Sequence, residues 1–462
     1  MKNNLILNEI NKQNKHWFAK DSSQALKKYK RKLFFELFKY LKEEQILSII
    51  GLRRTGKTTL LKQIIQHLIE KEKINSKQIL FISFDEALVT SKMPLTKYLD
   101  VFLDKTNENK LRYIFLDEIQ YIDKWQHILK RYYDTRPNIK FFVSGSSSLF
   151  IQKKTTESLA GRIYEFKLNH LTFEEYLEIS KAGSEIIKDY NKYAISDFDK
   201  IRYNEDEYQW FLSVRGNELE KLFEDYLLRH QFPETIQKEN DETIYKYIED
   251  AIYKKSIEYD IPRLFDINKI DELKFAFRIL ITETGNEIEF GKIASETGIE
   301  LNTFKKYLNY FHESLLFDIV YNYSKSIRKS RRLQKKGYIA SSNFFTTFHP
   351  ELFKIKTISN QYMGKLVETY IYNILKEKFE YISFYKKGQK EIDFICNNEI
   401  LSKDDTKLIE VKYVNNLERE KFLFLEKTAK DIFKTEKYFI FSKKQFNNNN
   451  KKIIIPCFLI KH

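Results

Sequence analysis

The sequence predicts an α/β protein with a parallel sheet at its core, and two patterns support this fold class. Between residues 46 and 146, short apolar runs alternate with longer amphipathic segments; the runs are ILSII, ILFISF, YIFLD and FFVSG. Strands that alternate with helices are typical of a three-layer parallel sheet. From about residue 348, a second α/β region follows the order helix, three strands, helix and strands, beginning with GKLVETYIYNILKEKF, YISFYKK, EIDFICN and KLIEVKYV.

The segments between these patterns divide the chain further. Residues 1–45 form an N-terminal helical segment, 46–170 the first α/β core, and 171–280 a helical lid or connector. In 281–347, FGKIASETG and TFKKYLNYFHE predict two helices, with Gly298 at the turn between them and Thr303 in a capping position. The extended stretches LLFDIVYNY and GYIASS then complete a winged helix, and 348–462 form the second α/β domain.

Composition narrows the classes of function. The 462 residues are 42% hydrophobic and 31% charged, which is typical of globular proteins and excludes a disordered chain. The net charge of +15 favours polyanionic partners, although an AT-rich genome would also inflate lysine. Two cysteines exclude a disulfide framework, and neither a signal peptide nor an 18-residue apolar stretch is found. We therefore expect a soluble cytoplasmic protein with no membrane association.

The most specific motif follows the strand ILSII and opens the helix TLLKQIIQHLI. It reads Gly51-Leu52-Arg53-Arg54-Thr55-Gly56-Lys57-Thr58, followed by Thr59, and fits the pattern G-x-x-x-x-G-K-[ST]. Two glycines let successive backbone N–H groups turn inward around an anion, and the helix N-terminus adds its positive dipole end. Lys57 would reach the β- and γ-phosphates of ATP, and the Thr58 hydroxyl would join the shell of Mg²⁺.

Two acids end the later strand YIFLD, at Asp117 and Glu118. Asp117 would hold Mg²⁺, and Glu118 would orient and deprotonate the attacking water. The next apolar strand ends in Ser144-Gly145-Ser146, where the Ser146 hydroxyl could sense the γ-phosphate or could belong to an ordinary turn.

These motifs, with VSGSSS and LAGR followed by FKLNHLTFEEYL, resemble those of bacterial and archaeal AAA-type ATPases with a restriction-endonuclease-like C-terminal domain. The resemblance covers most of the chain after about residue 25. It implies that Arg162 is an arginine finger acting in trans, hence in a homo-oligomer, although a structural ion pair is the alternative. The family often has two small residues before Phe-Pro-Glu, whereas this chain has His230-Gln231 there. A lid arginine on the γ-phosphate could be Arg229 or Arg263.

A second chemical centre is expected in the C-terminal domain. Glu410 and Lys412 are two residues apart on one strand and so face the same side, and an antiparallel neighbour can bring Asp393 beside them. Two carboxylates on one face bind hard cations such as Mg²⁺, and Glu368 in the preceding helix could complete the metal site. The pattern and the element order resemble the PD-(D/E)xK nuclease superfamily, which implies a catalytic role for Asp393, Glu410 and Lys412.

A basic run lies between the two wing strands, where a winged helix would touch a phosphate backbone. Its residues are Arg328, Lys329, Arg331, Arg332, Lys335 and Lys336. The run predicts DNA binding, although winged helices in ATPases also serve as contacts between domains or subunits. Tyr338 and Phe344 nearby could stack on bases or belong to the core.

Together these features predict a P-loop NTPase core of the AAA type with a helical lid, a winged helix and a C-terminal PD-(D/E)xK-like domain. The expected function is an ATPase that regulates or powers a metal-dependent nuclease-like domain acting on DNA. The alternative is an ATP-driven switch whose C-terminal domain is catalytically silent and only binds nucleic acid or a protein partner. A membrane-associated ATPase is the least favoured, because no amphipathic anchor is evident.

Overall fold

The computed structural model describes residues 2–18, 29–85, 93–146, 159–198, 200–201, 203–349, 359–399, 406–417, 422–449 and 451–461. The chain divides into two compact units, residues 1–169 and 170–462. Each unit is built around its own sheet, with five strands in the first and eight in the second. Among the described residues, no helix combines the length and apolarity that a bilayer crossing needs.

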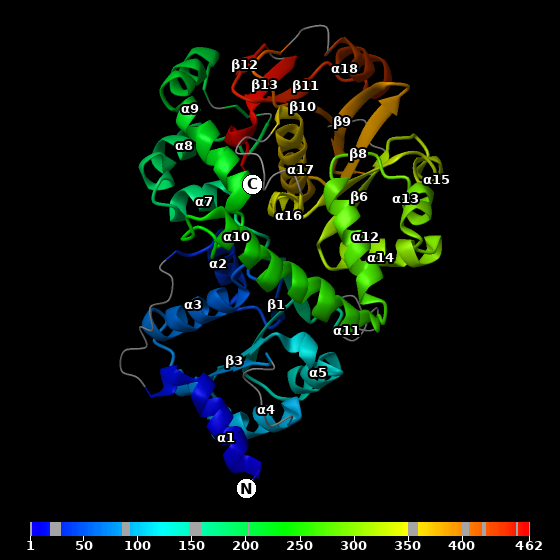
Figure 1. The fold of residues 1–462 in the computed structure, drawn as a ribbon. Helices are drawn as coiled ribbons and strands as arrows, with labels where there is room; N and C mark the ends of the chain where they lie inside the picture. Colours follow the sequence, from blue (N-terminus) through cyan, green and yellow to red (C-terminus); the bar gives the residue numbers. More distant parts are fainter. Residues whose placement is uncertain are drawn as a thin grey trace. The chain divides into compact units, whose positions relative to one another are not determined.

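The first unit is a parallel sheet with helices around it (Figure 1). Its strands lie in the order β2-β3-β4-β1-β5, and every neighbouring pair is parallel. The elements are α1 (Lys2–Gln13), α2 (Lys32–Leu37), β1 (Ile46–Ile50), α3 (Lys57–Glu70), β2 (Ile79–Ser83), α4 (Leu95–Leu103), β3 (Arg112–Asp117), α5 (Trp125–Thr135), β4 (Ile139–Gly145) and β5 (Ile163–Lys167).

Burial explains why these segments form strands and a helix. All residues of β1, β2 and β3 are buried, as expected for strands covered on both faces. On α3, Leu60, Leu61, Ile64 and Leu68 recur at helical spacing and pack into one core with the sheet. The strand–helix alternation that the sequence predicts is therefore confirmed.

The edge strand β2 has side-chain partners in place of a further strand. The Asn14 side chain accepts from the Phe81 N–H at 2.7 Å and donates to the Phe81 carbonyl at 2.8 Å. Gln13 accepts from the Ser83 N–H at 2.7 Å, and the Trp17 indole donates to the Ile79 carbonyl at 2.7 Å. Amide side chains at the end of α1 thus satisfy backbone groups that an edge strand would otherwise leave open.

The second unit begins with helices and ends in a mixed sheet. The elements before the sheet's first strand are α7 (Phe173–Ile179), α8 (Ile187–Tyr193), α9 (Glu205–Arg229), α10 (Asp241–Ile248), α11 (Ile261–Phe265), α12 (Ile270–Thr282), α13 (Phe290–Thr297) and α14 (Leu301–Glu313). Capping boxes at Thr172 and Asn204 start α7 and α9. The cap of α14 is Glu300, which accepts from two backbone N–H groups. The prediction that Thr303 caps this helix is wrong, because Thr303 lies inside its first turn.

The remaining elements follow the predicted order of helix, three strands, helix and strand after the winged-helix region. They are β6 (Phe317–Asn322), α15 (Ile327–Ser330), β7 (Lys335–Ile339), α16 (Ser342–Phe348), α17 (Asn360–Lys378), β8 (Tyr381–Lys387), β9 (Lys390–Asn397), β10 (Lys407–Lys412), α18 (Leu423–Thr428), β11 (Tyr438–Ser442), β12 (Asn447–Asn448) and β13 (Lys452–Pro456). Their sheet has the order β12-β13-β11-β10-β9-β8-β6-β7.

The two strands of the predicted wing belong to this sheet. β6 pairs antiparallel with β7 and parallel with β8, where Tyr321 lies opposite Ser383. The predicted boundary at 347 therefore falls within one compact unit and within the elements of one sheet. As a result, side chains of β7 and β9 can face the same side of one continuous surface.

Candidate functional site

The phosphate-binding motif forms a tight turn between β1 and α3. A Cβ on Gly51 would lie 2.1 Å from the Leu168 carbonyl oxygen, so no other residue fits there without moving the backbone. Gly56 has φ +101°, in the left-handed region that favours glycine, and Arg54 also has a positive φ of 65°. Both glycines of the motif are thus explained, one by a close approach and the other by its backbone angle.

Lys57 is buried at the start of α3, and its side chain hydrogen-bonds back to the first residues of the turn. Its ammonium donates to the carbonyls of Gly51 and Leu52, both at 3.0 Å. The Thr55 hydroxyl donates to the Leu52 carbonyl at 2.9 Å, and Arg31 donates to the Thr55 carbonyl at 3.0 Å. The turn is therefore held in shape by its own side chains, with the lysine charge at the helix N-terminus.

Asp117 collects hydroxyl groups from three other elements. Thr58 donates to its Oδ2 at 2.8 Å and Ser83 to the same oxygen at 3.2 Å, while Ser144 donates to Oδ1. Parallel strands bring these groups together because their carboxyl ends share one edge of the sheet. A carboxylate and a hydroxyl oxygen form the donor set that Mg²⁺ prefers, so Thr58 and Asp117 fit the predicted ion.

Glu118 follows directly and has a left-handed backbone, with φ 52°. The Gln120 amide donates to its Oε2 at 2.5 Å. Burial raises the pKa of Glu118, and Asp117 adds to the rise, while the charges of Lys57 and Arg53 oppose it. A carboxylate with a raised pKa is a stronger proton acceptor.

The other predicted residues of this region lie in different places. Thr59 follows Thr58 in α3, and Ser146 is buried just after β4. The contact to Asp117 comes from Ser144, two residues earlier, which the sequence argument did not select. Arg162 pairs with Asp134 at 2.8 Å, and its carbonyl accepts from Ile46 at the start of β1. Since the turn at Gly51 follows the other end of β1, Arg162 lies far from the phosphate site of its own chain.

The proposed lid arginines belong to the second unit. Arg229 donates to Asp241 at 2.6 Å and to Asp225 at 3.2 Å. Its guanidinium is thus held by two carboxylates at the end of α9. Arg263 lies in α11.

The C-terminal centre brings the predicted carboxylates and lysine together on the sheet. β9 and β10 are antiparallel neighbours, and Asp393 accepts from the Val411 N–H at 2.8 Å. The Lys412 ammonium lies 2.5 Å from Glu410 Oε1 and 3.9 Å from Asp393 Oδ2. Asp393 and Glu410 are both buried. The seventeen-residue spacing therefore produces the juxtaposition that the sequence argument describes.

Lys336 adds a second ammonium to this centre. It lies 3.0 Å from Glu368 Oε1 and 3.8 Å from Asp393 Oδ1, and it also pairs with Glu391. The Tyr338 hydroxyl donates to the same Glu368 oxygen at 2.7 Å. The prediction that Lys336 faces DNA is wrong, because its side chain is 6% exposed and bound to acids. Alternation along β7 turns it inward.

Glu368 is therefore paired with Lys336 and Tyr338. Among the described residues, no group of three or more acidic, histidine or cysteine side chains is arranged to hold a metal by itself. The predicted set of three carboxylates is thus not assembled, and a cation would rely on Asp393 and Glu410. Sequence reasoning also missed Glu391 and Tyr338 as members of the centre.

The electrostatics of Asp393 and Glu410 suit a cation. Burial raises the pKa of Glu410 to about 8, and Asp393 adds to the rise, while Lys412 opposes it. The Oε2 atom of Glu410 is buried, and no described group hydrogen-bonds to it. A carboxylate oxygen without a partner beside a second acid is where a divalent ion would bind most favourably.

Most of the predicted basic run is exposed, in α15 and in the residues that connect it to β7. Arg328, Lys329, Arg331 and Arg332 are exposed. The Arg331 guanidinium lies 4.4 Å from the centroid of the Tyr321 ring. Lys335 is half-buried and donates to the Leu333 carbonyl at 2.9 Å. Tyr338 and Phe344 are fully buried, which favours the core alternative over stacking on bases.

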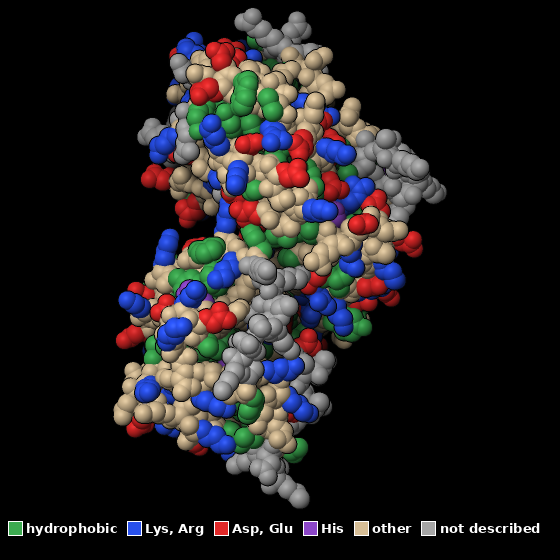
Figure 2. Space-filling model, turned by 90° about the vertical axis from the view of Figure 1, so that its left-hand side faces the viewer, with side chains coloured by type: hydrophobic (Ala, Val, Ile, Leu, Met, Phe, Trp, Pro, Cys, Tyr) green, Lys and Arg blue, Asp and Glu red, His purple; other side chains and the backbone are tan. Residues whose placement is uncertain are grey.

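One face of the molecule carries charges of both signs. On the face that Figure 2 displays, Lys and Arg side chains are interspersed with Asp and Glu. Mixed charges at this spacing create a weaker field than a basic run of one sign. The basic run around α15 is therefore a better candidate for a polyanion than the overall excess of lysine.

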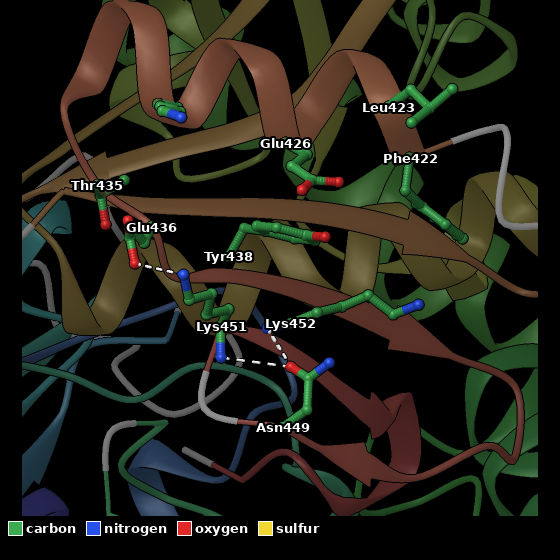
Figure 3. Close-up of a pocket in the computed structure, with 10 residues that line it drawn as sticks. Phe422, Leu423, Glu426, Thr435, Glu436, Tyr438, Asn449, Lys451 and Lys452 are labelled. Carbon is green, nitrogen blue, oxygen red and sulfur yellow. Dashed lines mark hydrogen bonds and ion pairs between the residues drawn. The ribbon is translucent and has the colours of Figure 1, made fainter.

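A cavity of about 370 Å³ lies beside α18 (Figure 3). Across it, Lys451 pairs with Glu436 at 2.7 Å, and the Lys452 N–H donates to Asn449 at 2.7 Å. Its lining residues are Phe422, Leu423, Glu426, Lys430, Thr435, Glu436, Tyr438, Asn449, Lys451 and Lys452. None of them belongs to the carboxylate centre, so the cavity is a separate feature of the same unit.

Two family models match different parts of the chain. A family model described as an AAA domain matches residues 43–177, which contain the turn at Gly51, Lys57 and the acids of β3. Residues 43–177 form an AAA-type P-loop ATPase domain. Residues 220–342 match a domain of unknown function (DUF8612). The AAA domain thus accounts for the first sheet, whereas β8–β13 lie outside both matches.

Similar proteins cover most of the chain at low identity. Two uncharacterized proteins of Methanocaldococcus jannaschii are 28% and 27% identical, over 84% and 82% of this chain and 79% and 74% of their own lengths. An uncharacterized protein of Haemophilus influenzae is 22% identical, over 87% of this chain and 92% of its own length.

Among solved structures, a Walker-type ATPase of Pyrococcus abyssi shares 14% identity, with a TM-score of 0.35, over 69% of this chain and 95% of its own. The DNA clamp loader delta protein of Bacillus subtilis shares 13%, with a TM-score of 0.24, over 74% of this chain and 99% of its own. TM-scores this low carry no argument about function.

Proposed function

We propose that this AAA protein binds and hydrolyses ATP with Mg²⁺ and thereby regulates a metal-dependent nuclease-like centre that acts on DNA. The observation that supports the first half is the cluster of Lys57, Thr58, Asp117 and Glu118 at one sheet edge. The second half rests on the convergence of Asp393, Glu410 and Lys412 on one face of the second sheet.

The residues of the AAA domain have separate tasks in hydrolysis. The Lys57 ammonium, which now donates to two carbonyls of its own turn, would transfer to the β- and γ-phosphate oxygens. Thr58 and Asp117 would hold Mg²⁺, which neutralises charge on the phosphates when bound. Glu118, whose pKa burial raises, would accept a proton from the attacking water. Arg162 would act on the site of a neighbouring subunit, because it lies at the opposite end of β1 from its own.

In the C-terminal centre, Asp393 and Glu410 would hold a divalent cation, which stabilises charge on a phosphodiester when bound. The Lys412 ammonium, now 2.5 Å from Glu410 Oε1, would position the hydrolytic water or stabilise negative charge. The exposed Arg328, Lys329, Arg331 and Arg332 would hold the DNA backbone by sequence-independent contacts.

A cleavage assay with three chains tests this proposal. Purified protein is incubated with Mg²⁺, ATP and linear or circular DNA, alongside the variants Asp393→Ala and Lys57→Ala. We expect cleavage to disappear in Asp393→Ala and to persist in Lys57→Ala with a lower rate or altered ATP dependence. Intact DNA in every sample, with ATP hydrolysed, would contradict the nuclease half.

One observation favours a second function, an ATP switch without cleavage. Every carboxylate of the C-terminal centre has an ammonium partner, since Lys336 and Lys412 contact all four acids. Ammonium groups that neutralise the acids weaken their pull on a metal ion. In this case the domain would only bind DNA or a protein partner.

DNA binding is tested through its salt dependence. Replacing Arg331 and Arg332 with alanine removes two side chains that could each neutralise one phosphate, and each phosphate that is no longer neutralised lowers the slope of log K against log salt by about 0.9. We expect a shallower slope by roughly 2 in the double variant. Lys246→Ala, at an exposed lysine paired with Asp250, is the matched control and should leave the slope unchanged. An unchanged slope in the double variant rejects the basic run as the binding surface.

A further inference from the structure

Lys336 enters the carboxylate centre from a strand that is three positions away from β9. β7 is the edge of the eight-stranded sheet, separated from β9 by β6 and β8. The lysine side chain passes near the Phe384 ring of β8, with its ammonium 5.7 Å from the ring centroid. It ends among Glu368, Glu391 and Asp393, which come from α17 and β9. The ammonium is thus delivered across the sheet to a site formed by other elements.

Three acids compensate for the burial of the Lys336 charge. Burial alone would lower the pKa of Lys336, yet Glu368, Asp393 and Glu391 outweigh it and raise the pKa. A buried ammonium is tolerated only when acids surround it in this way. The Lys336 ammonium is thus held by ion pairs between Glu368 of α17 and Asp393 of β9.

The charges of the centre do not balance. Four acids meet here, Glu368, Glu391, Asp393 and Glu410, against the two ammonium groups of Lys336 and Lys412. In the metal-bound state, in which a divalent ion displaces any proton from Glu410, all four acids are ionised and the six groups sum to two negative charges. The unpartnered oxygen is Oε2 of Glu410, whose other oxygen pairs with Lys412 rather than with Lys336. One divalent ion at Asp393 and Glu410 would restore neutrality and satisfy that oxygen.

We propose that Lys336 takes the place of a second metal ion, so that the centre binds one divalent cation, at Asp393 and Glu410. Glu368 then holds the Lys336 ammonium in place and does not bind the metal ion, so it is a positioning residue. This inference rests on the proposed cation site of the C-terminal domain, but it does not depend on DNA being cleaved.

Counting bound Mn²⁺ tests the inference directly. The full chain carries Asp117→Asn in every sample, which weakens the ion site of the AAA domain, and contains no nucleotide. Free Mn²⁺ is measured by electron paramagnetic resonance during titration. We expect one bound ion per chain, lost in Glu410→Gln. Two ions, or none, in the parent chain would overturn the inference.

The decisive variant is Lys336→Met. Without the ammonium, Glu368, Glu391 and Asp393 should accept a second Mn²⁺, so the count rises from one to two. Adding Glu368→Gln should return it to one. Lys443→Met is the matched control, because Lys443 also pairs with two glutamates, Glu220 and Glu224, but outside the centre; its count should stay at one. A folded Lys336→Met chain that binds one ion refutes the proposal.

Removal of a buried ammonium can prevent folding, so a melting curve with and without Mn²⁺ accompanies each titration. If Lys336→Met folds only with Mn²⁺, the ion replaces the ammonium and the proposal is supported. If Lys336→Met does not fold in either buffer, the double variant Lys336→Met, Glu391→Gln is used, because it removes both partners of one ion pair. We expect the double variant to bind two Mn²⁺ ions, and one bound ion per chain would overturn the proposal.

The outcome is separable from that of the nuclease assay. One ion at Asp393 and Glu410 without DNA cleavage rejects the nuclease and leaves this inference standing. Two ions in the parent chain with DNA cleavage reject this inference and leave the nuclease.

Discussion

The acids of the AAA domain and those of the C-terminal sheet are surrounded by different partners. Asp117 receives hydroxyl groups from Thr58, Ser83 and Ser144, which orient its charge without cancelling it. Asp393 and Glu368 instead meet the ammonium of Lys336, which cancels part of theirs. Hydroxyl partners leave a carboxylate free to attract a cation, whereas an ammonium competes with one. The partners of Asp117 are therefore compatible with the proposed exchange of an ion at the first site, whereas the second site already holds a fixed positive charge at Lys336.

The largest effect is expected from Glu118→Gln, which keeps the shape of the side chain and removes the proposed general base of the AAA site. General bases contribute about 10²- to 10⁴-fold to rate, so ATP turnover should fall by that factor. Binding of a fluorescent ATP analogue should change little. A turnover within about threefold of the parent would assign the base to another residue, and it would contradict the role given to Glu118 in the AAA site.

The pH dependence of stability tests the C-terminal carboxylate centre. The pKa of Glu410 is raised to about 8 in the folded chain, so the folded state binds a proton more tightly than the unfolded state. Stability from this group is present below the ordinary carboxyl pKa and is lost as pH rises towards 8. Glu410→Gln should remove that loss, which is on the order of 5 kcal/mol at about 1.4 kcal/mol per pH unit.

Urea unfolding at several pH values between about 4.5 and 8.5, in metal-free buffer, measures this difference. The parent chain should lose stability over this range relative to Glu410→Gln. Parallel curves for the two chains would show that Glu410 is already ionised at neutral pH.

A smaller loss is expected from Gly51→Ala in the phosphate-binding turn. Its Cβ would lie 2.1 Å from a backbone oxygen of Leu168, and relieving such overlap typically costs about 1–3 kcal/mol. Nucleotide affinity should fall as well, because the turn must shift. Gly291→Ala in α13 is the control, since nothing lies within 4 Å of its Cβ. A chain with unchanged melting temperature and affinity would contradict the tight approach.

An effect similar in size to that of Gly51→Ala is expected at the hydroxyl groups around Asp117. Ser144→Ala removes one hydrogen bond to a carboxylate, worth about 1.5–3 kcal/mol when the acceptor is charged. The apparent affinity for Mg²⁺ in ATP hydrolysis should weaken by roughly tenfold. Ser83→Ala removes the longer contact, at 3.2 Å, and should weaken it less. The reverse order would show that distance does not rank these two contacts.

Local motifs were predictable, whereas partners from distant elements were not. Residues 51–58 and the acids of β3 are contiguous runs whose chemistry depends on one strand–helix turn, so the sequence alone places them. Ser144 was missed because an isolated hydroxyl in an apolar strand carries little signal. Its position at the end of β4, beside β3, becomes informative only when the strand order is known.

Lys336 illustrates a different difficulty. In the sequence it ends a basic run and is adjacent to Lys335, so the two lysines look alike. Period-two alternation places Lys336 and Tyr338 on one face, and the apolar surroundings of Tyr338 are the signal that this face is buried. The pairing of β6 with β8, which brings the face to Glu368 and Asp393, could not be read from local residues.

The amide side chains at the end of α1 have a practical consequence for the AAA domain. Without Gln13, Asn14 and Trp17, the backbone of β2 would be open along its outer side and ready to join the same strand of another molecule. A chain shortened past residue 17 should therefore dimerise by pairing of β2 with β2 of a second molecule. The residues at and just after the end of α1 thus prevent β2 from pairing with another molecule.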